Sequence, residues 1–271
     1  MIADFNTPTL RESSVHFVKE GSIVRQIWGN ADTILVIFAG AAAEFALNKA
    51  VDWLYFTGRL PADPLGRLFS TVSYARAIVF SERKAALRAI EAIAAIHADV
   101  EAKRGTRIPD WAYRDVLFML IDYSIRAYEL LDRKLSRDEK QEVFDVFYEV
   151  GSRMGVPGLP ETLEAWEAMR QEHLLQDLQR SPYTQDLFRQ YRKHLGPLRY
   201  RILLETQKLV APSRVLSLLG FHRQSFLKPL LGLYKLSRIF KVDWLLKELI
   251  LPAEYKKQIN ALDQVPAGKH R

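Results

Sequence analysis

The feature that most restricts the fold of this chain is a series of capped segments whose apolar residues have the spacing of an α-helix. Ser136–Glu139 forms a capping box, with a serine at the N-cap and a glutamate three residues later. The apolar residues after it recur at intervals of four, three and four: Val143, Phe147, Val150 and Met154. Gly155 and Pro157 end the pattern, so a helix with one apolar face is predicted here.

Similar signals predict helices along most of the chain. Asp63 precedes a proline at a first helical position, and Asp110 is expected to cap another helix. The expected helices span about residues 34–47, 64–80, 82–104, 111–131, 137–154 and 183–208, and Pro160 is expected to open one more. No run alternates as a strand does, and glycine (13) and proline (12) are scarce. Because the breaks are short, the sequence predicts an all-α fold, a single globular multi-helix domain.

The cysteine content and the apolar segments bear on location. The chain has no cysteine, which excludes disulfides, iron–sulfur clusters, cysteine nucleophiles and thiolate-ligated haem, and agrees with a reducing compartment. The first twenty residues lack the apolar core of a secretion signal. The most apolar stretch, Ile34–Leu47, is short for a bilayer and contains Glu44, so a buried core helix is the better interpretation. We therefore expect a cytoplasmic protein.

The basic charge is concentrated near the C-terminus. Residues 192–257 hold 14 lysines and arginines against 4 acidic residues, a net charge of +10 in a chain whose total is +7. Two interpretations remain open. The cations can be solvated faces of helices that complete the core, which the sequence slightly favours. Alternatively, cations interleaved with apolar residues can make a peripheral contact with an anionic membrane. No nucleic-acid partner is expected.

Several common chemistries have no motif in this chain. There is no phosphate-binding loop, no dinucleotide-binding glycine pattern, no nucleophile elbow and no His-Glu-x-x-His zinc motif. The six histidines are scattered, with no pair at metal-ligand spacing. A zinc or di-iron site built from several histidines is therefore not expected.

One histidine falls within an apolar helical stripe. On the predicted helix 82–104 the stripe is Ala86, Ile90, Ile93, His97 and Val100. A buried imidazole needs a partner for each nitrogen, or loses about 1–3 kcal/mol per unsatisfied group. The residues alone favour a core histidine that hydrogen-bonds to the backbone, and leave an iron ligand as the second interpretation.

Arg67 and Thr71 form a second polar feature beside an apolar stripe. They are four residues apart on the helix that follows Asp63, and so share a face. The apolar residues of that helix are Leu68, Val72, Ala75 and Val79. An arginine there needs an anion, and its guanidinium fits a carboxylate, including a haem propionate. An ordinary arginine–glutamate ion pair is the plainer interpretation.

Together these features resemble the domain shared by the latex-clearing rubber oxygenases and the MpaB-type oxygenases. The similar segments are Gly21–Arg25, Asp63–Thr71, the Ile-His-Ala-Asp-Val run around His97, Ile121–Glu129, Leu135–Glu139, Gly151–Pro157 and, more weakly, Val210–Arg214 and Leu251–Tyr255. The resemblance covers about residues 15–257, which predicts one domain there with terminal tails at 1–14 and 258–271. The order and spacing of the segments carry the resemblance.

The resemblance implies an all-helical fold that encloses one haem b. It implies that His97 is the ligand of the iron, and that Arg67 and Thr71 belong to the haem pocket. Ser70 stands where the rubber-cleaving members have a lysine, and Asn48–Val51 stands where many relatives have a His-Pro-x-Val run. The pocket side facing Ser70 therefore departs from the type case, and the rubber substrate is not carried over.

The activity implied by the resemblance is that of a haem-dependent oxygenase. Its partners would be O2 and an apolar, unsaturated lipid or isoprenoid, because the pocket walls are expected to be apolar. Two alternatives remain: a non-catalytic haem protein, such as a sensor or store, and a haem-free helical scaffold at a membrane surface. The sequence identifies no general base and no oligomeric state.

Overall fold

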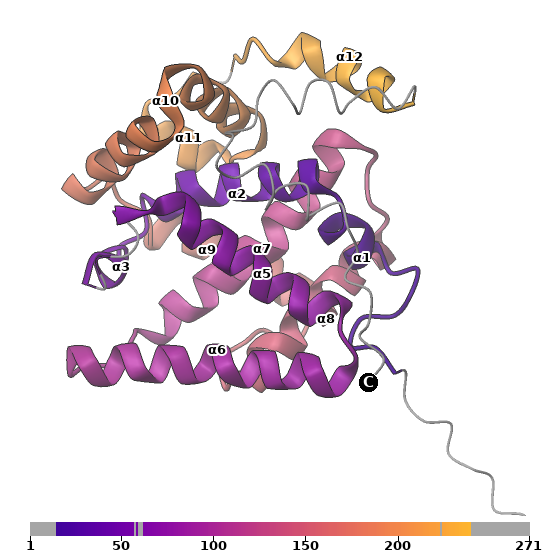
Figure 1. The fold of residues 1–271 in the computed structure, drawn as a ribbon, viewed down its shortest axis with the longest axis vertical. Helices are drawn as coiled ribbons and strands as arrows, with labels where there is room; N and C mark the ends of the chain where they lie inside the picture. The colour runs from indigo at the N-terminus through magenta and orange to yellow at the C-terminus, as the bar shows by residue number, and fades with distance from the viewer. Residues whose placement is uncertain (1–14, 57, 59–61, 223, 240–271) are drawn as a thin grey trace, which may run out of the picture.

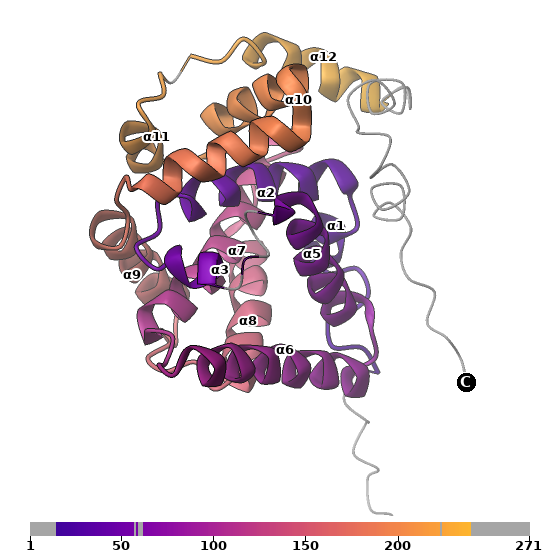
Figure 2. The ribbon, with the colours of Figure 1, turned by 60° about the vertical axis from the view of Figure 1, so that its left-hand side comes forward.

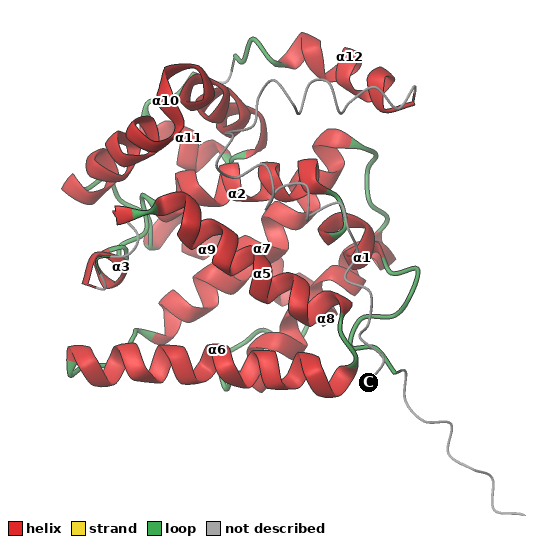
Figure 3. Cartoon of the chain, in the orientation of Figure 1, coloured by secondary structure: helices red, strands yellow, loops and turns green. Residues whose placement is uncertain are grey.

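A computed structural model of the chain describes residues 15–56, 58, 62–222 and 224–239, and every regular element in these ranges is a helix (Figure 3). The all-α prediction is therefore confirmed, and the helices form a single globular domain (Figures 1 and 2). The elements are α1 (Ile23–Trp28), α2 (Ala31–Phe45), α3 (Asp52–Phe56), α5 (Pro64–Phe80), α6 (Arg83–Arg104), α7 (Asp110–Leu131), α8 (Arg137–Arg153), α9 (Leu163–Gln176), α10 (Pro182–Val210), α11 (Ser213–Leu219) and α12 (Lys228–Ile239).

Two predicted N-caps are confirmed in detail. Asp63 Oδ1 accepts a 2.8 Å hydrogen bond from the backbone N–H of Gly66 at the start of α5. A Cβ on Gly66 would lie 2.0 Å from the Asp63 carboxylate, so this form of the cap requires glycine. At α8 the Ser136 hydroxyl accepts from the N–H of Glu139, and the Glu139 side chain accepts from the N–H of Ser136. Local capping thus sets where both helices begin.

The predicted cap Asp110 and the predicted opening residue Pro160 are misplaced by one and three positions. Asp110 is the first residue of α7 and the N-cap is Pro109, so Asp110 acts by its charge in the first turn. Pro160 does not open a helix. α9 begins at Leu163, because the Thr162 side chain accepts from the N–H of Ala165 and so supplies the cap.

The predicted helix 183–208 is present as α10, but it is kinked. Gly196 has φ 71° and ψ 172°, which is outside the helical region, and Pro197 follows it. Proline disfavours the helical conformation of the residue before it, and glycine tolerates the positive φ. Periodicity alone did not reveal this break.

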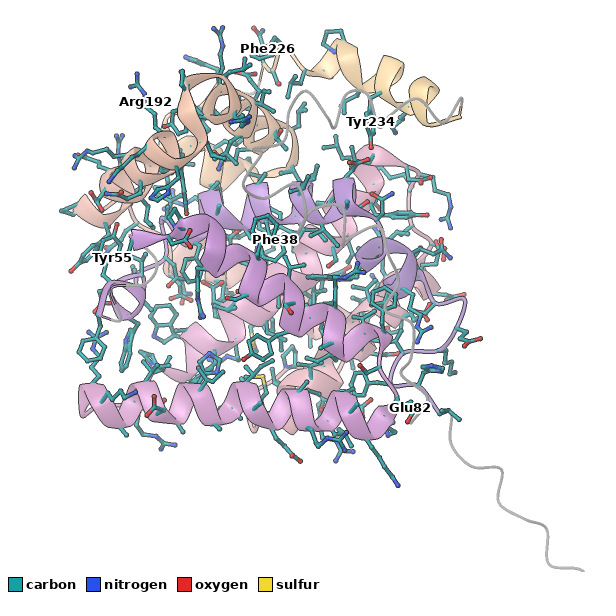
Figure 4. The ribbon with its side chains drawn as sticks, viewed as in Figure 1. Phe38, Tyr55, Glu82, Arg192, Phe226 and Tyr234 are labelled. Carbon is teal, nitrogen blue, oxygen red and sulfur yellow. The ribbon has the colours of Figure 1, made fainter. Side chains whose placement is uncertain are left out.

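The core forms around α2, which was predicted as a buried helix. α2 packs against α7 and α10, and Ile34 and Ile37 have no exposed surface. A Cβ on Gly40 would lie 2.3 Å from the Tyr123 ring, so glycine allows α2 and α7 to approach closely. Phe38 lies inside the bundle, whereas Arg192 and Phe226 lie at its outer edge (Figure 4).

The C-terminal part is described only as far as residue 239. α12 lies along the outside of the bundle, where Tyr234 donates to Asp32 and Lys235 Nζ donates to the carbonyl of Asp132 at 2.9 Å. The predicted tails, residues 1–14 and 258–271, and the segment 240–257 of the predicted domain lie outside the described residues. Within the described ranges, none of the helices combines the length and apolar character needed to cross a membrane.

Candidate functional site

The candidate site lies where α5 and α6 separate. The two helices meet at Ser81 and Glu82 and diverge from there in both views, with Glu82 marking the joint (Figures 1, 2 and 4). Arg67 lies 14 residues before Ser81 and His97 lies 15 residues after Glu82. At 1.5 Å per residue, each is about 20 Å along its helix from the joint. The two residues therefore lie at similar positions on the two arms of this wedge of helices, and the charge of Arg67 acts on His97.

His97 is half-buried on α6, next to a cavity. The predicted apolar stripe is fully buried only in its first half, at Ala86 and Ile90, so the expectation of a buried histidine holds only in part. The His97 ring meets the Tyr113 ring edge to face, with 5.2 Å between centroids. The cavity of about 190 Å³ is lined by Ala94, His97, Ala98, Glu101, Arg107, Ile108, Asp110, Tyr113 and residues 154–157.

One nitrogen of His97 has no hydrogen-bond partner. Nδ1 is buried and unpaired, although a core histidine bonded to backbone would have its nitrogens satisfied. Burial lowers the pKa of His97 below 6.5, the nearby charge of Arg67 lowers it further, and Glu101 partly opposes both. The imidazole is therefore neutral at pH 7, which is the form that ligates metals.

Arg67 and Ser70 border a second cavity at the start of α5. This cavity of about 300 Å³ is lined by Ala62, Asp63, Gly66, Arg67 and Ser70. The Ser70 and Thr71 hydroxyls donate to the Arg67 carbonyl at 2.8 and 3.1 Å. Those bonds hold both hydroxyls against the helix backbone. Of the predicted pocket residues on α5, two thus line a cavity, and Thr71 is not among the lining residues.

The donor set around His97 fits haem b. Within the described ranges no three His, Cys, Asp or Glu side chains gather as a metal site would require. Haem brings four of its iron ligands in the porphyrin, so a single neutral imidazole is a sufficient protein ligand. The guanidinium of Arg67, which acts electrostatically on His97, is suited to a propionate. A neutral histidine and an arginine whose charge acts on it are groups that could serve the iron and a propionate of haem b.

Sequence reasoning missed a buried ion cluster, formed by Glu44, Asp122, Tyr123 and Arg170. Arg170 donates to both oxygens of Glu44 at 2.5 and 2.7 Å, and to Asp122 at 3.0 and 3.1 Å. The Tyr123 hydroxyl donates to Glu44 at 2.9 Å. The cluster joins α2, α7 and α9. Its signal in the sequence was Glu44 itself, because a charge inside an apolar stretch needs a buried partner.

A second buried polar group involves Asn48, the residue that begins the run departing from the family pattern. Asn48 Nδ2 donates to Asp115, which has no exposed surface. Burial, followed by the charge of Glu44, raises the pKa of Asp115 to about 8. His173 Nδ1 lies 3.6 Å from Asp115 and 2.7 Å from Asp177, and burial lowers its pKa. Asn48 thus has a packing partner in the core and does not face the His97 cavity.

Comparison with known proteins gives one match. The sequence model of the family described as "ER-bound oxygenase mpaB/B'/Rubber oxygenase, catalytic domain" matches residues 25–238. Neither the curated proteins nor the solved structures include a match to this chain. The matched range covers well over half of the chain and contains the wedge, His97 and Arg67. The chain therefore belongs to the MpaB/rubber oxygenase catalytic-domain family, as its resemblance to these oxygenases predicted.

Proposed function

We propose that this chain is a haem-b-dependent oxygenase that acts with O2 on an apolar, unsaturated lipid or isoprenoid. His97 would be the protein ligand of the iron, with Arg67, Ser70 and Thr71 in the pocket. The observation that carries the proposal is the neutral, half-buried imidazole of His97, which faces a cavity within an oxygenase family domain.

His97 is suited to ligation by its charge state and by its position. Its depressed pKa keeps the lone pair free from protons at neutral pH. α6 is a regular helix of 22 residues, so the imidazole is presented by a rigid element. Arg67 would hold a propionate from the opposite arm of the wedge.

Part of the cavity wall is apolar and could contact an apolar substrate. Ala94, Ala98, Ile108, Met154 and Pro157 line the His97 cavity, together with the charged Glu101, Arg107 and Asp110. When bound, haem supplies the activation of O2, which amino-acid side chains cannot provide. The chain's own residues would hold the cofactor, exclude water and orient the apolar substrate.

Reconstitution tests the cofactor. The purified protein should take up hemin one to one, give a Soret band and unfold at a higher temperature with haem than without it. A stoichiometric complex at low micromolar hemin would support the proposal. The proposal fails if adding hemin produces no specific spectral change and no thermal stabilisation.

A matched pair of histidine variants tests the ligand. His97→Ala should lose most of the bound haem while the haem-free protein keeps its helical circular dichroism, because the rest of the core does not involve His97. His222→Ala changes an exposed histidine and should retain haem like the wild type. Equal haem occupancy in His97→Ala and wild type would assign the iron to another residue.

Oxygen uptake tests the activity. The reduced, haem-loaded protein should consume O2 in the presence of unsaturated fatty acids or isoprenoids, and less with their saturated counterparts. Haem binding without any substrate-dependent oxygen consumption would leave a non-catalytic haem protein, the alternative that the sequence kept open. The predicted bounds of the haem-binding domain, 15–257, and the cytoplasmic location belong to the same proposal.

The proposal includes a peripheral contact with an anionic membrane. Leu198 and Phe226 are exposed, Phe226 lies on the same side of the molecule as Arg192 (Figure 4), and the Arg201 guanidinium lies 5.4 Å from the Phe226 ring centroid. Each cation near an anionic surface adds about 1 kcal/mol, so a few suffice for reversible attachment. We expect the protein to sediment with anionic vesicles at low salt. It should not sediment with them at high salt, nor with neutral vesicles. No binding to anionic vesicles at low salt would exclude this contact.

A further inference from the structure

The unpaired Nδ1 of His97 raises the question of what receives its proton. If Nε2 ligates iron, Nδ1 carries hydrogen and needs an acceptor, as metal-bound histidines in proteins almost always have one. Nδ1 is buried and has no hydrogen-bond partner among the protein atoms. The groups that line the same cavity as His97 are the nearest candidates for this acceptor.

Glu101 is placed to be that group. It lies four residues after His97 on α6, on the same helix face, and both side chains line the 190 Å³ cavity. A volume of that size has room for several water molecules, since one takes about 30 Å³ in the liquid. Glu101 is the carboxylate whose charge acts on His97 against the charge of Arg67.

The Glu101 carboxylate is itself held in position. Its Oε1 accepts a 3.1 Å hydrogen bond from the Tyr113 hydroxyl and a 2.8 Å hydrogen bond from the backbone N–H of Ile108. Burial and the bond to Glu101 raise the pKa of Tyr113, so its hydroxyl remains a donor. The Tyr113 ring also contacts the His97 ring. Both donors bind Oε1, so the side chain is held through one oxygen and Oε2 is the oxygen that could accept from His97.

We propose that Glu101 is the positioning residue of His97: its carboxylate, held by Tyr113 and Ile108, takes the Nδ1–H through a water molecule or directly. This inference rests on the proposed function, because it assigns Nε2 to the iron. Glu101 fixes the tautomer that leaves the Nε2 lone pair facing the wedge. It also makes the imidazole a stronger electron donor, which favours ferric over ferrous iron.

The test compares two glutamate-to-glutamine variants on the same helix. Glu101→Gln removes the acceptor charge beside His97, while Glu91→Gln makes the same change at an exposed position of α6. Loss of an outer-shell partner weakens metal-site affinity by about 10–100-fold, so Glu101→Gln should raise the hemin dissociation constant by at least about tenfold. In Glu101→Gln the reduction potential of the bound haem should rise, and the ferrous iron–histidine stretching frequency should fall. Glu91→Gln should match the wild type in all three.

Two further variants separate positioning from simple structural support. Tyr113→Phe keeps the ring contact with His97 but removes the hydroxyl that holds Glu101, so it should shift the potential in the same direction by a smaller amount. Glu101→Asp keeps the charge, so its iron–histidine stretching frequency should lie between those of Glu101→Gln and the wild type. A purely structural role for Glu101 predicts neither the intermediate shift nor the rescue.

The tautomer of His97 in the haem-free protein provides an independent test. In the wild type, ¹⁵N chemical shifts of His97 should show the proton on Nδ1, and in Glu101→Gln it should move towards Nε2. If Glu101→Gln has the same tautomer, reduction potential and stretching frequency as the wild type, the inference about Glu101 is overturned and the haem proposal stays intact. Failure of the wild type to bind hemin would instead overturn the proposed function.

Discussion

The molecule holds two sets of buried or half-buried polar residues, and they differ in how completely protein atoms satisfy them. In the ion cluster, Arg170 has 2% of its side chain exposed and donates to two carboxylates through all three guanidinium nitrogens. At the candidate site, His97 is half-buried, has an unpaired Nδ1 and lines a cavity. The first set is closed by the fold, and the second is open towards a ligand.

This difference separates groups that hold the bundle together from groups suited to chemistry. Charges that pair within the core join helices, and removing one partner leaves an uncompensated charge behind. A neutral imidazole beside a cavity contributes little to the bundle, and its free lone pair is available to a metal. The variants described below test this distinction by their effects on stability, haem release and titration.

The largest effect is expected in the ion cluster. Arg170→Met leaves Glu44 buried without its cation and leaves Asp122 with Arg126 alone, so the haem-free protein should lose about 3–5 kcal/mol of unfolding free energy. His97→Ala should cost about 1 kcal/mol or less. Urea unfolding followed by circular dichroism measures both.

The matched control is an arginine that pairs with two carboxylates at the surface. Arg137 contacts Glu164 and Glu167, and all three side chains are largely exposed. Arg137→Met should leave stability nearly unchanged, because exposed ion pairs contribute little. Similar losses in Arg170→Met and His97→Ala would break the distinction between the two sets.

A smaller effect is expected for Arg67, which would bind a propionate and not the iron. Loss of one charge-assisted hydrogen bond corresponds to about a tenfold change in affinity, so Arg67→Met should release haem roughly tenfold faster. Transfer of haem to apomyoglobin gives the rate. Arg88→Met, an exposed arginine of α6, is the control. Faster release from Arg67→Met than from His97→Ala would reverse the assigned roles.

How far the sequence predicts this molecule depends on whether the signal is local. The caps at Asp63 and Ser136 depend on residues three positions apart, and both are confirmed. The kink at Gly196 was missed because periodicity continues across it. The Arg170 partnerships were missed because their residues are up to 126 positions apart and no single segment encodes them.

The candidate site shows the same division. His97 and Arg67 stood out because each is a polar residue in or beside an apolar stripe, and the structure places them on α6 and α5, close enough for the charge of Arg67 to act on His97. Glu101 did not stand out, since a glutamate four residues after a histidine looks like ordinary helix surface. Only the fold brings Tyr113 and the Ile108 N–H to it from beyond the end of α6.

A further prediction concerns the pH dependence of stability at Asp115. Its folded pKa of about 8 lies above its ordinary value of 3.8, so its contribution to stability is present at low pH and is lost as pH rises towards 8. Asp115→Asn cannot ionise and should flatten this loss. Between pH 6.5 and 8 the change in melting temperature should be smaller by a few degrees in Asp115→Asn than in the wild type. An unchanged slope in calorimetry would contradict the raised pKa.

The smallest effect is expected in the titration of His97 in the haem-free protein. Its pKa lies below 6.5 because burial disfavours the charged ring and because Arg67 repels it. Arg67→Gln removes the second cause and leaves the first, so the pKa should rise but remain below 6.5. Proton NMR of the ring measures it, with Arg88→Gln as control. If the pKa stayed the same, Arg67 would not face His97, and the wedge would lose the arginine that its proposed cofactor needs. A rise confined to Arg67→Gln would show that the two groups lie close enough to interact, as a single cofactor site requires.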